Sequence, residues 1–285
     1  MNPYIQMAAE YARLQREGRG YPLGGFPKFP RPDFAPEAPK VLIFSPHPDD
    51  EVIIGGLALR LLREAHWRVA NVAVTLGRKP ERQLGRLAEL QACCECIGFD
   101  LITTAPRGLT GVEPGVRQSD PVHWAESVRV IAGILERERP RVILFPHAVD
   151  WNSTHIGVHW LLADTLKTMP ADFTSYTVET EFWGAMADPN LLVEISPADL
   201  GAMITALTDH VVEVRRNPYH LSLPAWMQDN VRRGSELVGG QGGAAPDFTF
   251  ATVYRLRKWT AGKWEYPYTG GRQLASTADL TALFP

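Results

Sequence analysis

Two short polar segments hold most of the residues that could carry out chemistry. The first, Pro46-His47-Pro48-Asp49-Asp50-Glu51, places three carboxylates and an imidazole within five positions. Adjacent carboxylates raise one another's pKa, and a divalent cation offsets their repulsion. Histidine and aspartate ligands, with water completing the shell, are typical of a catalytic zinc site. The alternative is an acidic helix start, because Asp and Glu are favoured near helix N-termini.

The second segment runs from Pro146 to His155, with His159 one helical turn further along. Residues four apart share one face of a helix, so His155 and His159 could bind zinc together. The alternative is that one of them is a ligand and the other packs or hydrogen-bonds beside it. Because the first segment already offers two ligands, we favour this alternative for His159 and keep it as a candidate substrate-binding residue.

Strands and helices must bring these segments together. Apolar runs predict strands at 41–44, 69–74, 101–104, 141–145, 174–183, 191–195 and 248–259. Helical spacing predicts helices at 3–17, 52–65, 81–97, 121–138, 155–169, 197–215 and 225–238. Alternating strands and helices indicate an α/β fold, a Rossmann-like three-layer sandwich with a mostly parallel sheet. Both polar segments follow strands, and ligands bind beyond the carboxyl ends of parallel strands. We therefore expect the segments to face each other.

Composition limits the class of protein. Residues 1–39 predict a helix and a Pro/Gly-rich lead-in over the surface, and residues 40–285 a single domain. The net charge of −3 argues against nucleic acid as the main partner. No apolar run approaches the ~18 residues of a membrane span, and the N-terminus lacks an apolar signal core. The three clustered cysteines make a poor disulfide framework, so we expect a reduced, cytoplasmic protein.

The first segment resembles the signature of the LmbE/PIG-L family of zinc-dependent N-deacetylases, which typically reads Ala- or Pro-His-Pro-Asp-Asp-Glu after a hydrophobic strand. Weaker matches are Thr75-x-Gly77 and Arg86-x-x-Glu89. The segment leading to His155 is similar to the family's second motif, whose final histidine binds metal. The resemblance covers about residues 41–169, with a weaker likeness as far as Tyr254.

This resemblance implies that His47, Asp50 and His155 bind zinc, with Fe²⁺ or Co²⁺ as alternative metals. It also implies that Asp49 is the general base. Asp49 could take a proton from a metal-bound water, whose pKa zinc lowers to about 7.

Asn152 departs from the family pattern, which usually reads His-x-x-His in the second motif. Asparagine can donate a hydrogen bond to an oxyanion but cannot deliver a proton. The proton donor would then be Asp49 after protonation, or a histidine such as His147, His159 or His210. His210 is also a candidate substrate-binding residue. His147 has an equally good interpretation as a buried structural histidine.

Several other features have one interpretation as a functional group and another as ordinary structure. Arg86 belongs to a basic cluster that is either a solvated helix face or a cleft wall meeting an anionic group. Trp151 lies beside the proposed metal and could stack on a sugar ring. The three cysteines are expected to be buried packing residues. The loop 239–243 lacks the features of a phosphate loop and is a lid or a linker.

The sequence thus predicts a zinc-dependent hydrolase that removes an acetyl or other acyl group from the nitrogen of an amino sugar or related amide. The expected partner is a small N-acylated molecule, and we favour a sugar. The sequence does not indicate an oligomeric state. The alternatives are a metal-dependent amidase acting on a non-sugar conjugate, and a degenerate relative that binds metal and ligand without turnover. Asn152 is the feature that favours the degenerate relative.

Overall fold

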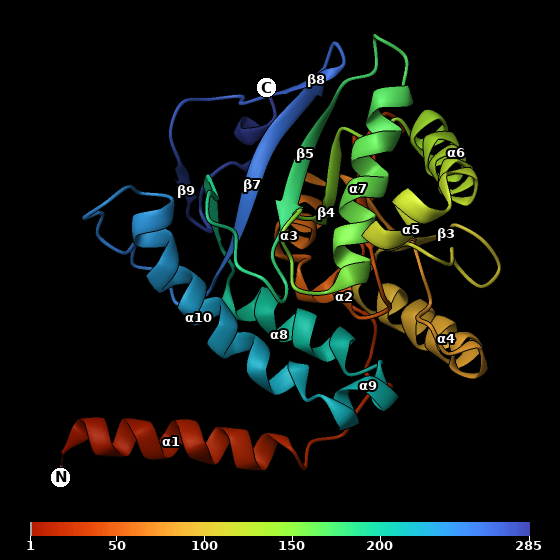
Figure 1. The fold of residues 1–285 in the computed structure, drawn as a ribbon. Coiled ribbons are helices and arrows are strands. Elements are labelled where there is room, and N and C mark those ends of the chain that lie inside the picture. The colour runs from red at the N-terminus through yellow and green to blue at the C-terminus, as the bar shows by residue number, and fades with distance from the viewer. Residues whose placement is uncertain (1) are drawn as a thin grey trace.

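A computed structural model describes residues 2–285 and contains one mixed sheet at its centre (Figure 1). The strands follow the order β3-β2-β1-β4-β5-β7-β6-β9, with β8 paired to β7. Their bounds are β1 (Lys40–Ser45), β2 (Arg68–Ala73), β3 (Asp100–Thr103), β4 (Val142–Pro146), β5 (Ser175–Thr180), β6 (Leu191–Glu194), β7 (Ala251–Thr260), β8 (Lys263–Glu265) and β9 (Arg272–Leu274). Strands β1 to β5 pair in parallel, whereas β7 runs antiparallel to β5, β6 and β8.

Helices cover both faces of this sheet. Their bounds are α1 (Pro3–Gly18), α2 (Asp50–Ile53), α3 (Gly56–Ala65), α4 (Pro80–Ile97), α5 (Pro114–Ser119), α6 (Pro121–Glu138), α7 (Ser153–Thr168), α8 (Pro197–Leu207), α9 (Val211–Arg216), α10 (Tyr219–Leu237) and the 3₁₀ turn η1 (Leu280–Leu283). Alternate residues of β1 enter opposite cores: Ile43 packs with α3, α4 and α8, and Leu42 with α6 and α7. Figure 1 shows α6 and α7 on one side of the sheet and α8 and α10 on the other. The predicted α/β class with a mostly parallel sheet is confirmed.

The predicted helix at 52–65 is in fact two helices, α2 and α3, because the chain turns at Ile54 and Gly55. A Cβ atom at Gly55 would lie 2.3 Å from the carbonyl oxygen of Glu51, so only glycine fits this turn. The Tyr254 hydroxyl bridges the break, since it accepts from the Leu57 amide and donates to the Ile54 carbonyl. The turn therefore leaves these two backbone groups satisfied.

The predicted helix at 197–215 is also interrupted, between α8 and α9. The lead-in supplies the reason: Gly24 N–H donates to the Thr208 hydroxyl, and Gly25 N–H donates to the Asp209 carboxylate. These bonds hold a non-helical bend that turns the next residue, His210, into the protein interior, where it is 1% exposed.

The N-terminal segment consists of α1 followed by an extended stretch that contacts the body of the protein. The tip of α1 stands away from the body, whereas its C-terminal half contacts α10 through a hydrogen bond from Gln15 to the Leu221 carbonyl (Figure 1). Beyond it, Phe29 N–H donates to the Cys96 carbonyl at the end of α4. The three cysteines are free and buried, in agreement with their predicted packing role. Among the described helices, none combines the length and apolar character required to cross a bilayer.

Candidate functional site

The first polar segment forms a tight turn between β1 and α2. Asp49 is the N-cap of α2 and has φ 110°, a left-handed conformation that is unusual for a residue other than glycine. The Asp49 N–H donates to Glu51 Oε2 at 2.9 Å, and the His47 N–H donates to Asp50 Oδ2 at 2.8 Å. The acidic residues therefore satisfy the backbone of their own turn, which fixes the directions of the side chains.

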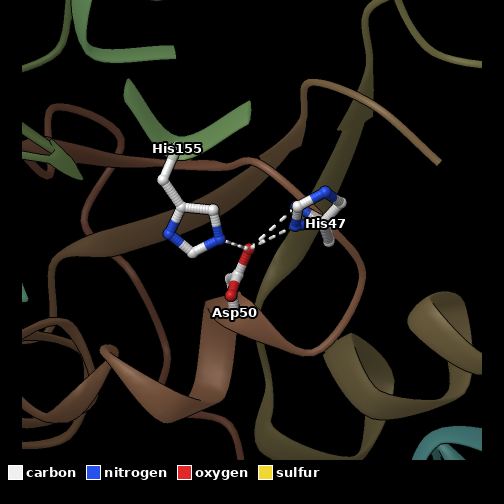
Figure 2. A group of neighbouring side chains, drawn as sticks. All are labelled: His47, Asp50 and His155. Atoms are coloured by element: carbon white, nitrogen blue, oxygen red, sulfur yellow. Dashed lines mark hydrogen bonds and ion pairs between the residues drawn. The ribbon is translucent and has the colours of Figure 1, made fainter. Parts of the chain in front are cut away.

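His47, Asp50 and His155 converge although they come from two segments about a hundred residues apart in sequence (Figure 2). Their ligating atoms all lie within 4.8 Å of one another. Asp50 Oδ2 is 3.6 Å from His47 Nδ1 and 3.4 Å from His155 Nε2. Both ring nitrogens of His155 are buried and have no hydrogen-bond partner. A buried imidazole without partners beside a carboxylate and a second imidazole fits a divalent cation, so the three residues predicted as ligands can hold one.

The two adjacent aspartates differ in their electrostatic environment. Burial and the neighbouring Asp50 raise the pKa of Asp49 well above its usual range. Burial would also raise the pKa of Asp50, but His155 and His47 outweigh it and lower that pKa. Burial lowers the pKa of His155, which favours the neutral imidazole that a metal requires. Asp50 is thus suited to ligation, and Asp49 to holding a proton.

Asp150 lies behind His155 and was not singled out from the sequence. Its Oδ1 is 3.7 Å from His155 Nδ1 and accepts the Asn152 N–H at 2.9 Å. Its Oδ2 accepts the Trp183 N–H at 3.1 Å. A Cβ atom at Gly184 would lie 2.8 Å from the Val149 carbonyl oxygen, so glycine allows the chain after β5 to lie against this loop. Asp150 therefore connects the candidate ligand to the wall of the site.

Two adjoining depressions open at this point. The inner depression, about 190 Å³, contains the candidate metal ligands and Asp49. It is completed by Arg86, Asn152, Phe182, Trp183, Glu213, Arg216 and Tyr219. The outer cleft, about 540 Å³, shares His47, Arg86, Asn152 and Arg216 with it. Its remaining lining residues are Leu76, Gly77, Arg78, Lys79, Arg82, Trp151, Ser153 and Thr154.

Several predicted site residues lie at these depressions. Arg86 donates to the Pro48 carbonyl at 2.8 Å and so supports the turn that carries Asp49. Trp151 is 80% exposed at the rim and its ring lies 6.2 Å from that of Trp183. Asn152 is the N-cap of α7, and its Oδ1 accepts the Thr154 N–H at 2.9 Å.

The other histidines that sequence reasoning considered line neither depression. His159 contacts the Pro146 carbonyl through Nδ1 at 3.0 Å, and His147 contacts the Gly184 carbonyl through Nε2 at 2.8 Å. His210 Nε2 donates to Glu51 Oε1 at 2.7 Å. All three are buried. The geometry gives them supporting contacts, so the expectation that His159 and His210 face a substrate finds no support there.

Sequence reasoning missed the far wall of the inner depression. Phe182 and Trp183 follow β5, Glu213 and Arg216 lie on α9, and Tyr219 begins α10. Burial raises the pKa of the Tyr219 hydroxyl, which remains a hydrogen-bond donor at neutral pH. The aromatic character of residues 182–183, at the end of the strand predicted over 174–183, was the one available signal.

The fold and the convergent residues define a class: an α/β protein with a candidate His–Asp–His metal site at the carboxyl end of its parallel strands. Residues 42–166 match the family model described as PIG-L, GlcNAc-PI de-N-acetylase. Over this region, which is less than half of the chain, the protein is similar to the PIG-L/LmbE deacetylase family, and solved structures of deacetylases share its fold. No curated protein matches the chain by sequence.

Several solved structures resemble the fold at low sequence identity. N,N'-diacetylchitobiose deacetylase from Pyrococcus horikoshii is 16% identical, with a TM-score of 0.52 over 87% of this chain and 92% of that one. The zinc-inhibited form of teicoplanin deacetylase Orf2 is 14% identical, with a TM-score of 0.52 over 80% of this chain and 100% of that one. GalB, the 4-carboxy-2-hydroxymuconate hydratase from Pseudomonas putida KT2440, is 15% identical, with a TM-score of 0.55 over 76% of this chain and 95% of that one. The fold thus also occurs in a hydratase, so the reaction must be argued from the site.

Proposed function

We propose that this protein is a metal-dependent hydrolase that removes an acetyl or related acyl group from the nitrogen of an amino sugar or similar amide. One observation carries the proposal. His47, Asp50 and the unpartnered His155 converge beside Asp49, within the region that matches a deacetylase family. The proposed domain spans residues 40–285, and the free cysteines support a reducing, cytoplasmic location.

The candidate ligands would hold Zn²⁺, with Fe²⁺ or Co²⁺ as alternatives. Such an ion polarises an amide carbonyl and lowers the pKa of a bound water to about 7. Asp49 lies in the same depression and would accept the proton of the attacking water. Because burial and Asp50 raise its pKa, the protonated carboxyl can persist long enough to return that proton to the leaving amine.

Asn152 would act on the oxygen of the scissile amide. Its Oδ1 is already engaged by the Thr154 N–H, which orients the side chain, and Asn152 lines both depressions. An amide donor that is held in place can stabilise a developing oxyanion. The exposed rings of Trp151 and Trp183 at this rim suit the faces of a sugar.

The test is acetate release from a panel of N-acetylated amino sugars and non-sugar amides, by protein loaded with one metal at a time. His47→Ala and His155→Ala should abolish both metal retention and turnover. His66→Asn is a matched control, since His66 is exposed and asparagine tolerates its left-handed backbone. Full metal occupancy in both alanine variants would contradict the site, and metal-loaded protein that releases no acetate from any substrate would contradict the reaction.

Asn152 also favours a second candidate, a protein that binds metal and ligand without turnover, because the family's second motif usually has histidine there. Tight binding of an N-acetyl sugar by the metal-loaded protein, with no acetate release, would support this candidate. Turnover of non-sugar amides alone would instead support an amidase acting on another conjugate.

A further inference from the structure

The outer cleft has a strong excess of positive charge. Arg78, Lys79, Arg82, Arg86 and Arg216 line it, and its lining contains no carboxylate. The protein as a whole carries a net charge of −3, so this concentration of cations is local. Like charges held around one cavity repel each other unless counter-charges enter it.

Within residues 2–285, two carboxylates outside the lining form ion pairs with these cations. Glu113 pairs with Arg78 at 2.7 Å. Glu213 is shared, at 2.6 Å from Arg216 and 3.7 Å from Arg82. The Lys79 side chain has no ion-pair or hydrogen-bond partner within residues 2–285, so its ammonium group is free to meet a ligand.

Two long helices add to this positive field. Both α4 and α7 begin at the outer cleft, next to Lys79 and at Ser153. The N-cap of α4, Lys79, makes no side-chain capping hydrogen bond, so the first amides of that helix lack a side-chain acceptor. Helix N-termini carry partial positive charge and are favourable positions for anionic groups.

The position of the cleft relates this charge to the chemistry. It shares His47, Arg86, Asn152 and Arg216 with the inner depression. A molecule whose amide lies beside Asp50 would therefore extend directly into the cationic cleft. We propose that the outer cleft is an anion subsite, and that the substrate is an N-acylated amine carrying a phosphate or carboxylate group. This inference rests on the proposed function.

Binding and turnover are measured separately, so that the two proposals can fail independently. Metal-loaded Asp49→Asn protein is titrated calorimetrically with N-acetylglucosamine, its 1-phosphate, and N-acetylmuramate, which carries a carboxylate. Charge-assisted hydrogen bonds predict that at least one anionic ligand binds roughly tenfold more tightly than the neutral sugar. Its affinity should fall as salt rises, because the cleft is open to solvent. Tighter binding of the 1-phosphate alone assigns the subsite to phosphate, and tighter binding of N-acetylmuramate alone to carboxylate.

The double variant Lys79→Gln/Arg82→Gln should remove most of this preference, whereas Arg129→Gln, an exposed arginine on α6, should retain it. Equal affinity for neutral and anionic ligands, or no binding of any of them, would overturn the subsite. So would a preference that survives the double variant. In the active protein the ratio of kcat/KM for the anionic over the neutral sugar should follow the same order. If the preference in binding holds but no substrate releases acetate, the proposed deacetylation fails while the subsite stands.

Discussion

Asp150 offers the sharpest test of how the candidate metal site is organised, through the substitution Asp150→Asn. Its Oδ1 accepts the Asn152 N–H and faces His155 Nδ1, and its Oδ2 accepts the Trp183 N–H. Asparagine keeps only one acceptor oxygen, so either the Asn152 or the Trp183 amide loses its partner. A donor left unpaired in a buried position costs about 1–3 kcal/mol, and these two bonds are partly buried, so we expect a loss of stability at the lower end of that range, and a lower Tm, for the metal-free variant.

The same substitution removes the negative charge that lies 3.7 Å from His155 Nδ1. Carboxylates behind a metal-binding histidine orient the ring, and their loss typically lowers metal affinity by roughly 10–100-fold, or about 1.4–2.8 kcal/mol. Zinc titration against a chromophoric chelator measures this change, and Asp172→Asn, at an exposed position, is the matched control. An Asp150→Asn protein that binds zinc as tightly as the parent would refute the orienting role, even if its Tm fell.

Three further predictions concern two other residues of the site and one ion pair outside it. Asp49→Asn should retain the metal and lose roughly 10²–10⁴-fold in turnover, and loss of the metal instead would make Asp49 a ligand. Asn152→Ala should lower kcat by up to roughly 10²–10³-fold, whereas Asn152→His should add a pH-dependent limb to the rate profile; unchanged rates in Asn152→Ala would exclude a chemical role. Although burial opposes it, Arg117 lowers the pKa of Asp164, so this pair stabilises the fold above about pH 4 and less as pH falls through the lowered pKa. The Tm difference between the parent and Asp164→Asn should therefore shrink between about pH 6 and about pH 2, and a constant difference would contradict this.

The parts of the fold that could be predicted are those that the pattern of apolar residues in a short stretch of sequence determines. Parallel strands buried on both faces have continuous apolar runs, and β1 and β4 were predicted to within a residue or two on that basis. The helix breaks after α2 and α8 could not be predicted in this way. They depend on the Tyr254 hydroxyl and on the amides of Gly24 and Gly25, which are distant in sequence.

The residues of the candidate site also fall into those that local sequence patterns predict and those that depend on distant packing. His47 and Asp50 lie in one contiguous turn, and His155 follows a strand that pairs directly with β1, so sheet topology brings them together. Arg216 and Tyr219 reach the site through α9 and α10, where the alternation of strands and helices has ended. Their positions depend on how these helices pack over the sheet, which no periodicity in the sequence expresses.

Asn152 is the N-cap of α7 and, under the proposed function, also acts in the reaction. A histidine at this position could titrate, but an N-cap requires a short side-chain acceptor, and asparagine supplies one to Thr154 N–H at the start of α7. The same helix carries the candidate ligand His155 in its first turn, so the cap helps to fix the metal site itself. Asparagine thus retains a donor for an oxyanion and gives up proton transfer. The nearby group suited to that task is Asp49, whose pKa is raised by burial and by Asp50. We therefore infer that, in this chain, one carboxylate both accepts and returns the proton.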